Sequence, residues 1–123
     1  MCRRAVGTEM TEAAIDLATY RELQNMAGAD FVVELVDTFL EEAPAMLAEL
    51  RSARAASDAQ RFRRAAHSLK SNSHTFGATA LGALARELER QGIADPARDA
   101  AALDALEAAY AHAAAALKEL RGG

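Results

Sequence analysis

Apolar residues recur every three or four positions along most of this chain, which is the spacing of amphipathic helices. The pattern predicts a short helix over residues 15–26, followed by four longer ones that begin near residues 30, 58, 78 and 96. No segment alternates apolar and polar residues in the way of a half-buried strand. Four long helices with short connections predict an all-α fold, an antiparallel up-and-down four-helix bundle with the short helix capping one end.

Residues that favour helix ends separate the predicted helices. Asp16, Asp30 and Asp58 suit N-cap positions, because an aspartate carboxylate accepts a hydrogen bond from a free backbone N–H. The Asp-Pro pair at 95–96 suits the start of the last helix, with proline in its first turn. Glycines follow three of the helices and are expected to end them, Gly77 in a left-handed conformation. The three glycines are Gly28, Gly77 and Gly92.

The second predicted helix contains a proline, Pro44. Proline has no backbone N–H, so the carbonyl near Leu40 loses its partner within the helix. We therefore expect one long, kinked helix here, in preference to two separate ones. Its inward stripe is predicted to be Val32, Val36, Phe39, Ala43, Met46 and Leu50.

The third predicted helix, from Asp58 to about Thr75, has two well-separated faces. One face carries Phe62, Ala65, Ala66, Leu69, Ser73 and Phe76. The polar side chains all lie within about 60° of His67 around the helix axis. They are Gln60, Arg63, Arg64, Lys70, Ser71 and His74. His67 is therefore predicted to lie at the middle of the polar face.

The last two predicted helices present simple apolar stripes. The fourth has Leu81, Leu84, Ala85 and Leu88 facing inward. The fifth has Leu103, Leu106, Tyr110, Ala113, Leu117 and Leu120, spaced as in a bundle or a coiled-coil seam. That regular seam leaves open a second interpretation, in which the chain is a helical dimerisation module.

Length and composition fit one small helical domain. The chain has 123 residues, of which 51% are hydrophobic, and alanine is abundant among them. We expect a flexible leader at residues 1–10 and a single helical domain at residues 11–121. The single cysteine, Cys2, and the lack of an apolar run of about 20 residues predict a soluble, cytoplasmic protein with no membrane contact.

The charge distribution is more informative than the net charge of −4, which argues against nucleic acid as the partner. Between Ala59 and Arg86 there are five basic residues and no acidic one. This basic window surrounds His67, so it favours a partner with an acidic surface or a phosphoryl group. A neutral imidazole is a competent nucleophile near pH 7, and Lys70 lies one helical turn away, where its ammonium can face phosphoryl oxygens.

At these residues the sequence resembles a known family. Residues 67–73 read H-S-L-K-S-N-S and residues 76–78 read F-G-A. This run is similar to the pattern H-x-L-K-G-S-S-x-x-L-G-A of histidine-containing phosphotransfer (HPt) domains. Residues 31–39 and 81–89 also resemble family segments, so that the resemblance covers roughly residues 15–92.

The resemblance implies a phosphorelay intermediate of two-component signalling. His67 would accept a phosphoryl group from the aspartyl phosphate of one receiver domain, in a hybrid histidine kinase, and pass it to the receiver domain of a response regulator. Lys70 would stabilise the charge of that group, while Ser71 occupies the position where the family usually has glycine. The residues expected to help dock the receiver are Arg63, Arg64, Ser71, His74 and Phe39.

The same reasoning predicts what the protein does without. It lacks an ATP-binding segment, so no kinase activity of its own is expected. His67 and His74 are about 10 Å apart on a straight helix and have no third ligand nearby, so we expect no metal site and no cofactor. A monomer is expected. The alternative function is a non-catalytic helical adaptor, or a degenerate HPt fold that docks receiver domains without transfer.

Overall fold

Helices account for nearly all of residues 14–122, which are the residues that the computed structural model of this protein describes. No strand occurs in this part of the chain, so the all-α prediction is confirmed. The helices are α2 (Leu17–Ala27), α3 (Ala29–Ala55), α4 (Ala59–Phe76), α5 (Thr79–Gln91) and α6 (Pro96–Leu120). The predicted leader at residues 1–10 lies outside the described residues.

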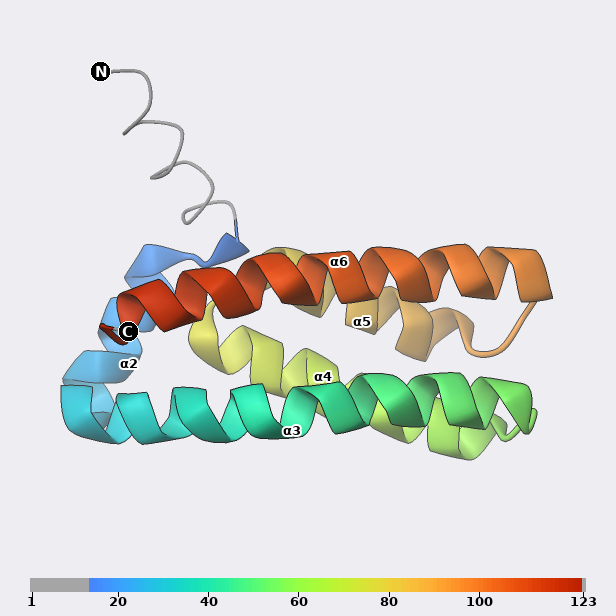
Figure 1. The fold of residues 1–123 in the computed structure, drawn as a ribbon, viewed down its shortest axis with the longest axis horizontal. Coiled ribbons are helices and arrows are strands. Elements are labelled where there is room, and N and C mark those ends of the chain that lie inside the picture. Colours follow the sequence, from blue (N-terminus) through green and yellow to red (C-terminus); the bar gives the residue numbers. More distant parts are fainter. Residues whose placement is uncertain (1–13, 123) are drawn as a thin grey trace, which may run out of the picture.

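Helices α3 to α6 run up and down in an antiparallel bundle, and α2 lies across one end of it (Figure 1). Helix α4 packs mainly on α5 and α3, and α6 closes the bundle on α5 and α3. Helix α2 touches both α3 and α4, where the backbone N–H of Asp16 donates to the carbonyl of Gly77 at 2.7 Å. The short helix therefore caps the bundle, as the sequence predicted.

The helix ends follow the predicted residues except at Asp16 and Asp30. The carboxylate of Asp58 accepts a hydrogen bond from the backbone N–H of Arg61 at 3.1 Å, which confirms this cap. Gly77 ends α4 with φ 81° and ψ 19°, the predicted left-handed conformation. The prediction of Asp30 as an N-cap is wrong, because α3 already begins at Ala29. Gly28, with φ 95°, makes the turn between α2 and α3 and places Asp30 inside the first helical turn.

Asp16 immediately precedes α2, as predicted, but its carboxylate does not bond a backbone N–H. It accepts a hydrogen bond from the hydroxyl of Thr19 at 2.7 Å instead.

Helix α3 continues through Pro44 as one helix of 27 residues. The carbonyl of Leu40, which proline leaves without an intrahelical donor, accepts a hydrogen bond from the hydroxyl of Tyr110 in α6 at 3.4 Å. The same Tyr110 ring contacts Phe39 edge-on, with ring centroids 6.0 Å apart. The carbonyl that Pro44 leaves without a donor in its own helix is thus bonded by a side chain of the neighbouring helix α6.

The predicted inward face of α4 is buried in full, from Phe62 to Phe76. Its one polar member, Ser73, donates its hydroxyl hydrogen to the carbonyl of Leu69 at 2.6 Å, so it is buried with its hydrogen bond satisfied. The stripe of α3 differs from the prediction at one position. Leu47 is buried there, whereas Met46 is only partly covered.

Helix α6 buries the apolar seam that had suggested a dimer. Leu103, Leu106 and Leu117 are each at most 3% exposed within the single chain, so the bundle itself accounts for this seam. The first turns of α6 also bury Asp99, at 1% exposure. Its carboxylate accepts hydrogen bonds from Arg54 of α3 at 2.8 Å and from the backbone N–H of Ala94 at 2.9 Å. This buried pair attaches the connection between α5 and α6 to the end of α3.

Candidate functional site

The polar face of α4 is exposed between α3 and α5, and His67 lies at its centre. The buried side chains of Phe62 and Leu69, both fully covered, hold the opposite side of the helix in the core. The His67 side chain is 59% exposed. Since the buried face fixes the rotation of α4, the imidazole is presented to solvent by a rigid element.

A carboxylate from the neighbouring helix holds the imidazole. His67 Nδ1 lies 2.8 Å from Oε2 of Glu89, which is near the end of α5. The other oxygen, Oε1, lies 2.8 Å from Nζ of Lys70. Glu89 therefore bridges the two side chains of the predicted site, and the three residues form one hydrogen-bonded group that we call the His67 triad.

Glu89 is ionised in this arrangement. The hydrogen bond from Lys70 is the main reason that the pKa of Glu89 lies below its ordinary value of 4.5, and the bond from His67 lowers this pKa further. Partial burial raises this pKa and outweighs the His67 bond taken alone, but it is smaller than the effect of Lys70, and the net pKa is lowered. An ionised carboxylate can only accept hydrogen bonds, so the shared proton belongs to Nδ1 of His67.

This tautomer has a chemical consequence. When the neutral ring has its proton on Nδ1, the lone pair is on Nε2. The carboxylate also fixes the orientation of the ring and can stabilise positive charge on it, as carboxylates do for histidines that bind metals. The group can therefore present Nε2 as a nucleophile, with the Lys70 ammonium one turn away.

Two other residues of the predicted site lie along the seam between α4 and α5. The His74 ring covers Gly82 so closely that a β-carbon there would be 2.6 Å from the ring. The guanidinium of Arg63 lies over Gly92, where a β-carbon would be 3.3 Å from its nearest nitrogen. Both side chains are thus placed against α5 and the residue that follows it, although both residues remain exposed.

The remaining predicted residues are divided between the surface and the core. Arg64 and Ser71 are both exposed, and Arg64 lines the space between α4 and α3. Phe39 is not a surface residue, because it is 4% exposed and packs against Phe76 with ring centroids 5.4 Å apart. The structure therefore assigns Phe39 to the core and not to a docking surface.

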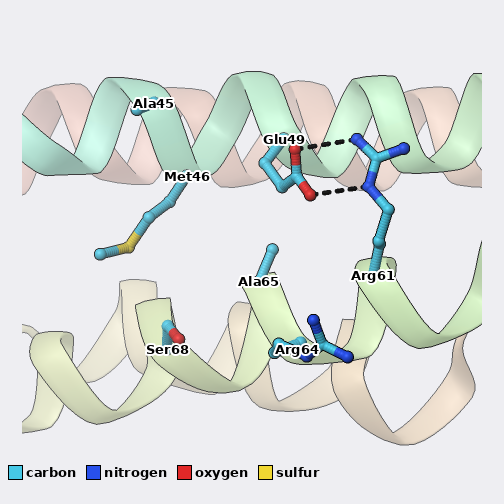
Figure 2. A pocket seen from close by; sticks show the side chains of 7 residues that line it. All are labelled: Ala45, Met46, Glu49, Arg61, Arg64, Ala65 and Ser68. Carbon is cyan, nitrogen blue, oxygen red and sulfur yellow. Dashed lines mark hydrogen bonds and ion pairs between the residues drawn. The ribbon is translucent and has the colours of Figure 1, made fainter.

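A groove opens on the α3 side of this face (Figure 2). It has a volume of about 280 Å³. It is lined by Ala45, Met46 and Glu49 of α3 and by Arg61, Arg64, Ala65 and Ser68 of α4. Ser68 directly follows His67 and Arg64 precedes it by one helical turn, so the groove borders His67 on the α3 side.

The sequence did not reveal two parts of this site. Glu89 lies 22 positions after His67 and on another helix, so only the crossing of α4 and α5 makes it a partner. The sequence signal for Glu89 was its position at the end of residues 81–89, a segment that resembles the HPt family. The groove had no sequence signal, since it depends on small residues of two helices that face each other.

Comparison with known proteins identifies the family. The Hpt domain family model matches residues 34–120, which include the whole His67 triad. The chain belongs to the HPt domain family. The predicted resemblance is thereby confirmed, and it extends into α6, beyond the part of the chain that the motifs covered.

Two relatives show how far the HPt likeness goes. The chain is 30% identical over 100 residues to the Sensor protein TorS of Escherichia coli K12, a match that covers 76% of this chain and 11% of TorS. Its fold superimposes on histidine-containing phosphotransfer protein B (HptB) of Pseudomonas aeruginosa PAO1 with a TM-score of 0.79. The two sequences are 32% identical, and the match covers 88% of this HPt domain and 94% of HptB.

The structure also bears on membrane insertion. None of the HPt helices between residues 14 and 122 combines the length and the apolar character that a bilayer crossing requires.

Proposed function

We propose that this chain is a phosphorelay intermediate of two-component signalling that carries the phosphoryl group on His67. Its membership of the HPt family and its likeness to HptB support the reaction class. The observation that carries the assignment to one residue is the 2.8 Å contact between His67 Nδ1 and the ionised Glu89, which leaves Nε2 as the nucleophile.

The Nε2 lone pair attacks the phosphorus of an aspartyl phosphate on a receiver domain in line, so that an N–P bond forms as the bond to the carboxylate oxygen breaks. The leaving carboxylate keeps the electron pair. The proton on Nδ1 stays on the ring, and Glu89 stabilises the positive charge that the ring gains.

Lys70 supplies the nearest cation for the transferred group. In the free protein its ammonium is paired with Glu89 at 2.8 Å. The same flexible side chain can turn toward the phosphoryl oxygens, whose charge then replaces that of the carboxylate as its partner. The reverse of this step returns the group to an aspartate, so the domain can pass it to the receiver of a second protein.

The test is a transfer experiment with radiolabelled receiver domains of hybrid histidine kinases. Label that reaches the chain should be acid-labile and base-stable, as expected of phosphohistidine. His67→Gln should receive none, whereas His74→Gln, which changes the other histidine of the same face, should still be labelled. If His67→Gln is labelled like the wild type, the assignment is wrong. If receivers bind the chain and no label moves, the alternative of a docking adaptor is correct.

The role of Glu89 gives a second prediction. Glu89→Gln keeps the shape and one oxygen acceptor but removes the charge that both His67 and Lys70 contact. The initial rate of labelling should fall on the order of tenfold, the usual effect of removing a residue that orients a reactive histidine. Glu87→Gln is the matched control, because Glu87 lies in the same helix but pairs with Arg90. Equal rates for the two variants would show that Glu89 does not hold the nucleophile.

A further inference from the structure

The two flanks of the His67 face differ. On the α5 flank the surface is filled. The His74 ring lies against Gly82 of α5, and the Arg63 guanidinium lies against Gly92, which follows α5. On the α3 flank the groove of about 280 Å³ stays open (Figure 2). A partner that reaches Nε2 of His67 therefore meets a closed seam on one side and a hollow on the other.

Two of the residues that line the groove are alanines. Ala65 of α4 is nearly buried, at 8% exposure, and Ala45 of α3 is exposed, and their short side chains fill little of the space between α3 and α4. Met46 lies at one end, where its sulfur is 4.0 Å from the amide nitrogen of Asn72. Methionine is flexible and adapts its shape to what contacts it. The hollow is thus suited to one apolar side chain from a partner.

The charges at the groove are unequally paired. At the end away from Met46, Arg61 donates two hydrogen bonds to Glu49, at 2.8 and 2.9 Å, and this pair spans α3 and α4 (Figure 2). Within residues 14–122 the guanidinium of Arg64 has no hydrogen-bond or ion-pair partner. It is close enough to Glu49 to lower the pKa of that carboxyl, although Arg61 is the main cause. One exposed cation at the rim is therefore available to an incoming carboxylate.

The groove lies within the area that a docked receiver covers. A standard protein interface buries about 800 Å² on each partner, far more than the imidazole itself. Arg64 is one turn before His67 and Ser68 is the next residue, so an interface centred on Nε2 includes both. Methionine and arginine are enriched at protein interfaces, and Met46, Arg61 and Arg64 line this groove.

We infer that this groove is the subsite by which the protein selects its receiver domain. It takes one apolar side chain of the receiver in the hollow beside Met46 and Ala65, and Arg64 pairs with a carboxylate beside that side chain. The inference rests on the proposed function, since it assumes that a receiver docks at His67. It adds the feature of the receiver that is recognised, an apolar residue next to an acid.

The experiment measures the phosphorylation of His67 separately from the transfer of the phosphoryl group to a docked receiver domain. Phosphoramidate, a small donor that needs no protein interface, phosphorylates His67 of each variant, and the loaded amount is measured. Each loaded protein is then mixed with every receiver domain encoded in the genome that carries this chain. Transfer rates are compared at equal phosphohistidine.

Two variants change the groove and two are matched controls. Ala45→Trp fills the hollow, and Arg64→Glu reverses the unpaired charge. Ala48→Trp places the same bulk on an exposed position of α3 outside the groove, and Arg21→Glu makes the same charge change on α2 at the end of the bundle. Circular dichroism of each variant checks that the bundle is intact.

We expect transfer to the best receiver to slow on the order of tenfold or more in both groove variants and to stay within about twofold in both controls. The loss in Arg64→Glu should be recovered when an acidic surface residue of that receiver is changed to lysine. Groove variants that transfer like the wild type would overturn the inference and leave the proposed function intact.

Two further outcomes are decisive. If the loaded wild type passes its label to no receiver, the proposed function fails, and the inference falls with it. If the wild type sediments as a dimer that Ala45→Trp dissociates, a second copy of the chain occupies the groove, and the inference is wrong.

Discussion

The hydrogen bond between Tyr110 and the carbonyl of Leu40 offers a quantitative test of how the bundle tolerates Pro44. The substitution Tyr110→Phe removes only the hydroxyl and keeps the ring that contacts Phe39. The variant loses the side-chain donor that replaces the N–H missing from Pro44.

The geometry sets the expected magnitude. A hydrogen bond contributes about 0.5–1.5 kcal/mol net to the free energy of unfolding. The 3.4 Å distance is longer than the usual range and the carbonyl of Leu40 is only partly buried, so the lower half of that range applies. Tyr110→Phe should therefore lower the free energy of unfolding by about 0.5–1 kcal/mol, or the Tm by about 2–4 °C.

Urea unfolding of four proteins tests this explanation as a double-mutant cycle. In Pro44→Ala the backbone N–H of residue 44 is restored and can donate to Leu40, so Tyr110→Phe should cost less than about 0.3 kcal/mol in that background. Pro44→Ala alone should be stabilising, because proline is unfavourable inside a helix. Equal losses from Tyr110→Phe in both backgrounds would refute the link between the proline and the tyrosine.

Three further predictions concern stability. Gly82→Ala should leave the free energy of unfolding unchanged or raise it by up to about 1 kcal/mol, because alanine is the better helix former inside α5 and the exposed His74 ring, whose atoms would be 2.6 Å from the new β-carbon, can turn away. A loss of more than about 1 kcal/mol that His74→Ala restores would show that the His74 ring cannot move and would contradict this prediction. Asp99→Ala should lower the free energy of unfolding by about 3 kcal/mol, because it leaves Arg54 and the backbone N–H of Ala94 without their buried acceptor. Similar urea midpoints for the variant and the wild type would contradict this. Finally, hydrogen bonds from arginine or lysine lower the pKa values of four surface glutamates below 4.5. These carboxylates therefore stabilise the fold above pH 4.5, and their contribution is lost as the pH falls through the lowered pKa values. Urea midpoints should be level between pH 7 and 5 and lower at pH 3.5, and a midpoint that rises on acidification would contradict the sign. The four residues are Glu49, Glu87, Glu89 and Glu107.

The helices and the faces of α4 could be predicted because they depend on local spacing and on single residues. The period of the apolar positions fixes which side of α4 is buried, and Asp58 and Gly77 determine its ends through their own side chain or backbone. Pro44 even indicated which carbonyl would need an outside donor. The identity of that donor could not be predicted, because Tyr110 reaches Leu40 only through the arrangement of α6 against α3.

The errors have the same origin in tertiary structure. Met46 and Leu47 both continue the α3 stripe at helical spacing, and the position of α4 decides that Leu47 is the buried one. Asp30 has the chemistry of a cap, but the positive φ of Gly28 starts the helix earlier. Glu89 was visible as an acid after a leucine stripe, yet its role depends on how α5 crosses α4. Contacts between helices therefore account for what the sequence left undetermined in the site.

The central claim is that the Glu89 carboxylate accepts a hydrogen bond from Nδ1–H of His67 and so leaves Nε2 to receive the phosphoryl group. Long-range ¹H–¹⁵N NMR of the histidine ring, recorded before and after phosphorylation by phosphoramidate, tests it directly. The spectra should show the neutral His67 ring protonated on Nδ1 at first, and phosphorus bonded to Nε2 afterwards. A ring protonated on Nε2, phosphorylation on Nδ1, or a phosphoryl group on a residue other than His67 would contradict the claim.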